Sequence, residues 1–255
     1  PDVCDGGQAI AATSTDYFAP YKVQAWDKIP DTAKDADGAY YADYTGIMSV
    51  GWNADKYGDI SSLDDLLDPK FAGTVALNGK PAEAGAAFNG YLMANQLAGG
   101  DINNLQPGLD YFKKLKEAGN RTIDSGQTGV VFDWTYNQAS YKKELKDKGV
   151  NWKYKTFPKA QVVSYYNQAI NKDAPHPAAA RLWEEYLYTA DAQNLWFKGG
   201  ANPVLLDSMK EDGTVDQATL KDAITIEGEP VSYTNDDSTR ITEWLQNNWD
   251  KTIGN

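Results

Sequence analysis

Three segments of the chain repeat one order of residues: a short apolar run, a polar turn, and then the start of a helix. They are PDVCDGGQAIAA (1–12), GTVALNGKPAEAGAAFNGYLMANQL (73–97) and GVVFDWTYNQASYKKELKDKG (129–149). This alternation is typical of an α/β fold with mostly parallel strands. We therefore predict an α/β protein. No internal repeat or low-complexity linker interrupts the pattern.

The spacing of apolar residues indicates where the elements lie. Strands are expected at 74–77 and 130–132, the first followed by a helix with Pro81 in its first turn and the second by a helix that Thr135 caps. Residues 44–53 and 161–171 are expected to be extended. Three further helices are indicated by apolar residues at helical spacing, namely Leu109, Phe112 and Leu115; Leu182, Trp183, Tyr186 and Leu187; and Ile241, Trp244, Leu245 and Trp249.

Composition argues against several classes of function. The 255 residues suit one large or two small domains, and the formal net charge of −12 disfavours nucleic acid or an anionic membrane as a partner. No apolar run approaches the roughly 20 residues of a membrane-spanning helix. Cys4 is the only cysteine, so it forms no internal disulfide. The single histidine, His176, lies between two prolines, which argues against Ser-His-Asp and zinc chemistry.

Polar and aromatic residues follow the predicted strands, where ligands of open α/β sheets bind. Asp133, Trp134 and Tyr136 could offer a carboxylate and aromatic faces to a cationic group; alternatively, Asp133 only caps the following helix. Asp5 and Gln8 could donate or accept hydrogen bonds to a ligand, or could form an ordinary glycine turn. Asn78 precedes a helix start whose backbone N–H groups could hold an anion.

Five segments in this order resemble the extracellular solute-binding proteins of bacterial ABC importers, type II, in the polyamine, iron(III) and phosphonate group. They are YYADYTGIMSVGWNAD, SSLDDLLDPKFAGTVALNG, NLQPGLDYFKKLKEAGN, SGQTGVVFDWTYNQA and YYNQAINKDAPHPAAARLWEEYLYTADAQNLWFKGGANPV. The resemblance covers nearly the whole chain, and DLLDPKFAGTVAL and DAPHPAAARLWEEYL are its most specific stretches.

The resemblance implies a two-lobe periplasmic-binding-protein type II fold whose hinge the chain crosses more than once. The expected lobes are 1–45 with 168–225, and 54–160 with 235–255. The expected hinge segments are 46–53 and 161–167, and the solute is expected in the cleft between the lobes. Members of the family carry further strands and helices before the position of PDVCDGG. The resemblance thus implies an N-terminal truncation and a longer precursor with a signal or lipoprotein peptide.

The resemblance also bears on the ligand. Iron-binding relatives carry two adjacent tyrosines where this chain reads DWTYN, which disfavours iron(III). Tyr165 and Tyr166 are adjacent, but neighbouring residues of a strand face opposite ways, so one of them is expected in the cleft. Tyr44, near the first hinge crossing, is a candidate for the cleft wall.

From these residues we expect a substrate-binding component of an ABC transporter and not an enzyme. The expected solute is a cationic amine such as a polyamine, with iron(III) or a phosphonate-type anion as alternatives. A cysteine-dependent transferase that uses Cys4 on the same fold is an alternative of another class. We expect no cofactor and no bound metal, a membrane permease as partner, a monomer, and a periplasmic or extracellular location with a possible lipid anchor.

Overall fold

The chain folds into two compact units, each built from two separate stretches of sequence. Unit 1 comprises Pro1–Gly46 and Ser164–Thr225, and unit 2 comprises Ile47–Val163 and Ile226–Asn255. The computed structural model describes residues 1–122, 128–226, 229–231 and 233–254. Residues 125–127 of the segment SGQTGVVFDWTYNQA therefore lie outside the described part. No helix in these ranges is both long and apolar enough to cross a membrane.

Two long strands belong partly to each unit. Strand β3 (Tyr41–Asn53) carries the chain from unit 1 into unit 2, and β7 (Val163–Asn171) carries it back. Nearly every residue of β3 is buried, which agrees with the many apolar and small residues in its sequence. The extended character expected for both stretches is therefore confirmed.

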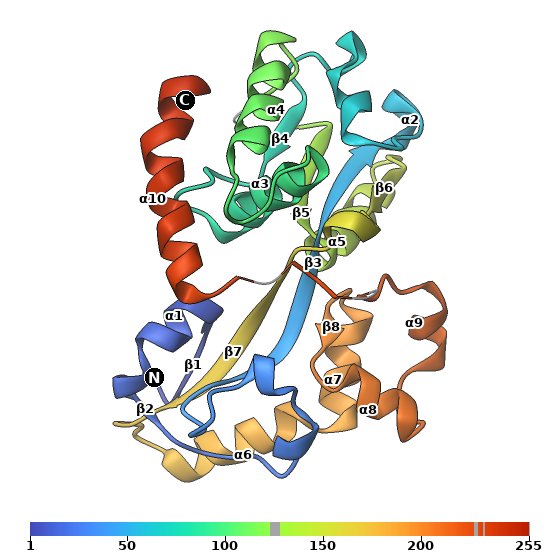
Figure 1. Cartoon of the computed structure of the whole chain (residues 1–255). Coiled ribbons are helices and arrows are strands. Elements are labelled where there is room, and N and C mark those ends of the chain that lie inside the picture. The colour runs from blue at the N-terminus through green and yellow to red at the C-terminus, as the bar shows by residue number, and fades with distance from the viewer. Residues whose placement is uncertain (123–127, 227–228, 232, 255) are drawn as a thin grey trace. The chain divides into compact units, whose positions relative to one another are not determined.

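Unit 2 is a sheet covered by helices (Figure 1). Its remaining elements are α2 (Ala54–Tyr57), β4 (Val75–Leu77), α3 (Gly85–Leu97), α4 (Gln106–Glu117), β5 (Val130–Trp134), α5 (Thr135–Lys146), β6 (Trp152–Lys155) and α10 (Asn235–Thr252). Strand β5 pairs in parallel with β4, and β3 pairs antiparallel with both β5 and β6. Helix α3 packs on β5 and on α4, α10 packs on α4, and α5 packs on β5 and β6.

The helices of unit 2 follow the predicted apolar faces. Leu109, Phe112 and Leu115 of α4 are buried, as are Ile241 and Leu245 of α10. This outcome is expected when apolar residues recur every three or four positions, because they then form one stripe toward the core.

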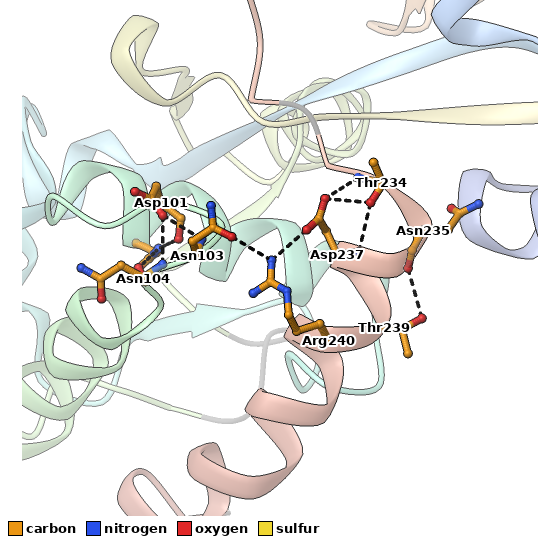
Figure 2. A network of polar contacts seen from close by, with 9 residues as sticks. Asp101, Asn103, Asn104, Thr234, Asn235, Asp237, Thr239 and Arg240 are labelled. Atoms are coloured by element: carbon orange, nitrogen blue, oxygen red, sulfur yellow. Dashed lines mark hydrogen bonds and ion pairs between the residues drawn. The ribbon is translucent and has the colours of Figure 1, made fainter.

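Helix α10 begins with a capping box, shown in Figure 2. The Thr234 hydroxyl accepts from the Asp237 backbone N–H at 3.1 Å, and Asp237 Oδ2 accepts from the Thr234 backbone N–H at 3.0 Å. Arg240 donates from Nη2 to Asp237 Oδ1 at 2.8 Å and to Asn103 Oδ1 at 3.4 Å. The start of α10 is thereby tied to the loop between α3 and α4.

Unit 1 contains the remaining helices and strands (Figure 1). They are β1 (Val3–Gly7), α1 (Gln8–Thr13), β2 (Phe18–Ala19), α6 (Pro177–Leu187), α7 (Ala190–Lys198), β8 (Asn202–Pro203), α8 (Leu206–Glu211) and α9 (Gln217–Asp222). Strand β7 pairs antiparallel with β1 and β2, and β3 pairs antiparallel with β8. The main core of the unit gathers around Tyr41, Leu187, Tyr188, Phe197 and Met209.

The expected α/β fold is confirmed, but the prediction of mostly parallel strands is wrong. Among the pairs of named strands whose direction is described, β4–β5 is parallel and the other five are antiparallel. Strands β4 and β5 are joined through α3 and α4, the kind of crossover that parallel pairing requires. Alternation of strands and helices in a sequence does not specify the direction in which long strands such as β3 are paired.

Several predicted boundaries also differ from the structure. Helix α3 begins at Gly85, because residues 81–83 form a turn and Pro81 lies outside the helix. Asp5 and Asp133 lie within β1 and β5 rather than in turns after them. Thr135 does not cap α5: Trp134 occupies the N-cap position, and the Thr135 hydroxyl accepts from the Ile47 backbone N–H at 3.3 Å.

The helix expected from Leu182, Trp183, Tyr186 and Leu187 is present as α6, but most of these residues do not lie on its buried face. Leu182, Trp183 and Tyr186 are 72%, 47% and 44% exposed, and only Leu187 of that set is buried. The buried stripe instead comprises Ala180, Glu184 and Leu187. Because a glutamate lies on the buried stripe, the apolar residues alone do not mark the buried face of α6.

Candidate functional site

Asp133 is held at the end of β5 by a complete set of hydrogen-bond donors in unit 2. Its Oδ1 accepts from the Trp134 backbone N–H at 2.8 Å and from Asn137 Nδ2 at 2.9 Å. Its Oδ2 accepts from Asn78 Nδ2 at 2.8 Å and from the Tyr141 hydroxyl at 2.9 Å. The residue is 0% exposed. Each oxygen already has two donors, so a ligand that bound this carboxylate would have to replace one of them.

The two aromatic residues after Asp133 differ in burial. The Trp134 side chain is part of the unit 2 core, whereas Tyr136 is only partly buried. Their rings lie 6.3 Å apart with planes 18° from parallel. Tyr136 therefore presents the more accessible ring of the pair.

Three aromatic rings stack in unit 1. Tyr44 of β3 lies against Tyr166 of β7, with centroids 5.2 Å apart and planes 3° from parallel. Tyr44 also contacts Trp196 of α7, with ring centroids 4.5 Å apart and planes 29° from parallel. All three residues are partly buried. The sequence indicated Tyr44 and Tyr166 but gave no sign of Trp196, because nothing in the LWFKGG stretch specifies a partner far away in the chain.

Tyr165 and Tyr166 point to different surroundings. Tyr165 packs against the main core of unit 1, and burial raises the pKa of its hydroxyl. Tyr166 stacks on Tyr44 instead. This divergence follows from the alternation of side chains along β7, and the two hydroxyls do not form a paired set of metal donors.

The β1–β7 pairing places amides and acids side by side in unit 1. Asp5 lies opposite Gln168, which donates from Nε2 to Asp43 Oδ2 at 3.1 Å. Asn167 donates from Nδ2 to Gln8 Oε1 at 3.1 Å. Partial burial of the Asp5 carboxyl raises its pKa, and a hydrogen bond from Gln168 partly opposes that rise.

These acids lie close to the stacked aromatic rings. The pKa of the Tyr44 hydroxyl is raised first by burial and then by the charges of Asp5 and Asp43, with Tyr166 adding to the effect. Asp5, Tyr44 and Tyr166, predicted separately from the sequence, are therefore brought together in unit 1. In unit 2, Asp133 and Asn78 are brought together in the same way.

Two buried acids of unit 1, Asp43 and Glu184, were not predicted from the sequence. Asp43 and Glu184 are both 0% exposed. Both oxygens of Glu184 and Oδ1 of Asp43 have no hydrogen-bond donor within the described structure. Burial raises the pKa of each carboxyl to about 8, and mutual repulsion with neighbouring acids adds to the rise. The Tyr41 hydroxyl lies close enough to lower the Glu184 pKa, although it makes no hydrogen bond of ordinary geometry.

The sequence profile of the bacterial extracellular solute-binding proteins matches residues 9–223. The chain belongs to that family. It is a substrate-binding protein of the type II kind that serves ABC importers, and its family places it outside the cytoplasmic membrane. No curated protein sequence matches this solute-binding protein closely enough to count as a relative.

Solved structures share the fold of this solute-binding protein at low sequence identity. AfuA from Actinobacillus pleuropneumoniae, with bound fructose-6-phosphate, is 19% identical over 99% of this chain and 82% of its own, with a TM-score of 0.70. The spermidine/putrescine protein PotD from Streptococcus pneumoniae is 13% identical over 99% and 84%, with a TM-score of 0.70. Iron-bound HitA from Pseudomonas aeruginosa is 18% identical over 96% and 82%, with a TM-score of 0.66. The two-lobe periplasmic-binding fold is thus confirmed, while these proteins differ in what they bind.

Three features bear on the alternative chemistries of this solute-binding protein: groups of metal-ligating side chains, Cys4 and His176. Within the described ranges, no three or more His, Cys, Asp and Glu side chains gather closely enough to hold a metal ion. Cys4 is partly buried on β1, and none of its described contacts is a hydrogen bond to a base. His176 is 74% exposed and lies 3.4 Å from Asp2. It occupies the N-cap position of α6, but its side chain does not cap the helix.

Proposed function

We propose that this protein captures a small cationic amine, such as a polyamine, and delivers it to the membrane permease of an ABC importer. The observation that carries the proposal is the acid beside stacked aromatic rings in unit 1. Asp5 has exposed surface and acts electrostatically on Tyr44, which stacks between Tyr166 and Trp196. A carboxylate next to aromatic faces is a combination suited to ammonium groups, through ion pairing and cation–π contact.

Among the acids, Asp5 suits an ammonium group better than Asp133. The Asp133 oxygens are already occupied by four donors and the residue has no exposed surface. Asp5 is exposed, and Gln168 is the hydrogen-bond donor that acts on its carboxyl. We therefore assign the ion pair with the solute to Asp5. Solute contacts stay predictions for five other residues, namely Asp133, Asn78, Trp134, Gln8 and Tyr165. In unit 2, Tyr136 offers an accessible aromatic ring.

Solute capture is proposed to involve closure of two lobes. The proposed lobes are 1–45 with 168–225 and 54–160 with 235–255, joined by hinge segments 46–53 and 161–167. This assignment is supported by β3 and β7, because each of these long strands carries the chain from one unit to the other. We also propose that the protein acts as a monomer and is lipid-anchored or free outside the membrane; light scattering after size-exclusion chromatography tests the first of these points.

A titration of the intact protein with spermidine, putrescine, phosphate, a phosphonate and iron(III) citrate tests the choice of solute. We expect binding of an amine, and a stabilisation of about 2.7 kcal/mol when its concentration is 100-fold above the dissociation constant. Asp5→Asn is expected to weaken amine binding at least about tenfold, because it removes the charge of the ion pair. Asp207→Asn is the matched control in unit 1, since that side chain is 93% exposed on α8.

Two outcomes of this titration contradict the proposal. A phosphonate or iron(III) that binds while both amines fail would overturn the amine assignment. Amine binding that is equally strong in Asp5→Asn and Asp207→Asn would overturn the role of Asp5 and leave the solute class intact.

We infer that the protein is not an enzyme. The alternative of a Cys4 nucleophile requires a base, and the described surroundings of Cys4 contain no hydrogen-bonded base. Cys4→Ser is expected to leave amine affinity unchanged. A thiol-dependent consumption of the solute that is lost in Cys4→Ser would contradict this inference.

A further inference from the structure

Unit 2 contains a pocket that none of the predicted solute contacts lines. It has a volume of about 220 Å³ and lies between the residues that follow β4 and the C-terminal part of α10. Its lining residues are Leu77, Gly79, Lys80, Arg121, Thr122, Trp249 and Gly254. The pocket is smaller than the roughly 300–1,000 Å³ typical of sites for drug-sized ligands, so it suits a small ion or group.

Arg121 lies in this pocket and forms no ion pair at close range with a described acid. Its backbone bridges to Val75 of β4, and its guanidinium lies 5.5 Å from the Trp249 ring centroid. Partial burial lowers the pKa of Arg121, and the charge of Asp250 opposes that shift. No described side chain accepts a hydrogen bond from the guanidinium. A guanidinium has five N–H donors, and placing it in a half-buried site is costly unless acceptors satisfy them.

Lys80 brings a second positive charge to the same pocket. Gly79 adopts a φ of +106°, a left-handed turn that directs the chain from β4 to Lys80. The Lys80 ammonium lies 3.7 Å from the Glu83 carboxylate and its side chain is 43% exposed, so its donors are not used up by a close ion pair. Lys116 lies at the same end of α10, with Nζ 3.5 Å from the Thr252 carbonyl oxygen.

The charges around the pocket favour an anion. Among the described residues, the lining of the pocket has two basic side chains, Arg121 and Lys80, and no acidic one, which leaves an excess of positive charge in the lining. The excess is notable in a protein whose formal net charge is −12. Guanidinium and ammonium groups together match the several acceptor oxygens of a phosphate or similar oxyanion.

We propose that this pocket is a binding site for a small oxyanion such as phosphate, held by the guanidinium of Arg121 and the ammonium of Lys80. The guanidinium also lies 5.5 Å from the centroid of the Trp249 ring. The site is separate from the amine contacts proposed for unit 1 and does not depend on them. An anion here stabilises unit 2 by linking the chain after β4 to the residues beside α10.

Nuclear magnetic resonance can test the site directly, because the chain has only three arginines, Arg121, Arg181 and Arg240. The Nε–H signals of a ¹⁵N-labelled sample are followed at mildly acidic pH as inorganic phosphate is added at constant ionic strength. We expect the Arg121 signal to shift and to saturate, and the signals of Arg181 and Arg240 to stay in place. Arg121→Lys identifies the signal by removing it.

Matched lysine variants then separate a built site from general charge attraction. Lys80→Gln is expected to weaken phosphate binding about tenfold, because it removes one charge-assisted contact. Lys113→Gln removes a comparably exposed lysine, paired with Glu117 at 3.8 Å on α4, and is expected to have no effect. The proposal is overturned if the Arg121 signal does not move, if all three arginine signals drift without saturation, or if the two lysine variants behave alike.

Discussion

The two units bury carboxyl groups in opposite ways. In unit 2, Asp133 is fully buried and accepts four hydrogen bonds from Trp134, Asn137, Asn78 and Tyr141. In unit 1, Asp43 and Glu184 are just as buried, yet three of their four oxygens have no donor among the described residues. Burial alone therefore does not decide what an acid does to stability. The effect depends on the surrounding hydrogen-bond donors, because burying a carboxylate without donors disfavours its charged form.

The difference has a consequence for each unit. Asp133 joins the end of β5, the loop after β4 and helix α5, so it acts as an anchor for that part of unit 2. Asp43 and Glu184 keep their protons to a higher pH than ordinary carboxyls and so link the stability of unit 1 to pH. Four substitutions can break or sharpen this comparison.

The largest effect is expected from Asp133→Asn. The asparagine keeps the shape but replaces one acceptor oxygen with an NH₂ donor, which then faces two other donors. We expect the free energy of unfolding to fall by about 3 kcal/mol. The reason is that buried donors lose their acceptor and the remaining hydrogen bonds no longer go to a charged carboxylate. Urea denaturation measures the loss, and amide hydrogen exchange should locate it in β5 and α5.

Asp207→Asn is the control, because Asp207 is almost fully exposed and pairs only with Lys210, at 3.2 Å. It should leave the unfolding free energy unchanged. If Asp133→Asn is equally harmless, the four donors do not anchor β5, and the contrast between the units fails.

The next effect concerns the pH dependence of unit 1. The pKa of Glu184 is raised from 4.5 to about 8 and that of Asp43 from 3.8 to about 8, so the folded state binds protons more tightly than the unfolded state. Their contribution to stability is fully present below the unfolded values and is lost as the pH rises toward about 8. We expect the unfolding free energy of unit 1 to fall across that range, which urea denaturation at a series of pH values measures.

Glu184→Gln should flatten this slope, since it removes one of the two ionising groups. Near the upper end of the range the variant is expected to be more stable than the natural sequence, whereas near pH 5 the two should be similar. Glu211→Gln, on the exposed surface of α8, is the control and should keep the full slope. An unchanged slope in Glu184→Gln would show that Glu184 is not one of the groups responsible.

The sequence predicted unit 2 better than unit 1, and the buried acids explain part of the reason. In α4 and α10 the apolar residues alone mark the inward face, so Leu115 and Ile241 were identified correctly. In α6 the inward stripe includes Glu184, which local hydrophobicity assigns to solvent. Leu182, although apolar, is exposed instead.

The candidate sites show the same limit. The acid and aromatic residues near Asp133 and Tyr44 could be picked out because they follow or lie within apolar strands. Their donors could not: that Tyr141 reaches Asp133, or that Trp196 stacks on Tyr44, depends on tertiary packing between distant segments. A carboxylate saturated by its own protein therefore looks, in sequence, the same as one available to a solute.

Tyr141→Phe is expected to have a moderate effect. The substitution removes the hydroxyl that donates to Asp133 Oδ2 at 2.9 Å and leaves the ring in contact with Trp152, at 6.1 Å between centroids. Loss of one hydrogen bond to a carboxylate should reduce the unfolding free energy by about 1.5 kcal/mol. In the Asp133→Asn background the same change should cost less, because the acceptor has already been altered. Equal costs in both backgrounds would mean that the two side chains are not coupled.

Tyr41→Phe gives the smallest expected effect and is the counterpart of Tyr141→Phe in unit 1. The Tyr41 hydroxyl is buried and makes no hydrogen bond of ordinary geometry, so its removal breaks no pairing and removes an unsatisfied polar group. The ring keeps its contacts with Trp26 and Tyr188, at 5.5 Å and 5.3 Å between centroids. We expect the unfolding free energy near pH 5 to change by no more than about 0.5 kcal/mol. Because the hydroxyl lowers the pKa of Glu184, its removal should also move the pH-dependent loss of stability slightly upward. A cost as large as that of Tyr141→Phe would show that the Tyr41 hydroxyl is paired in solution and that the two units bury their acids more alike than the structure indicates.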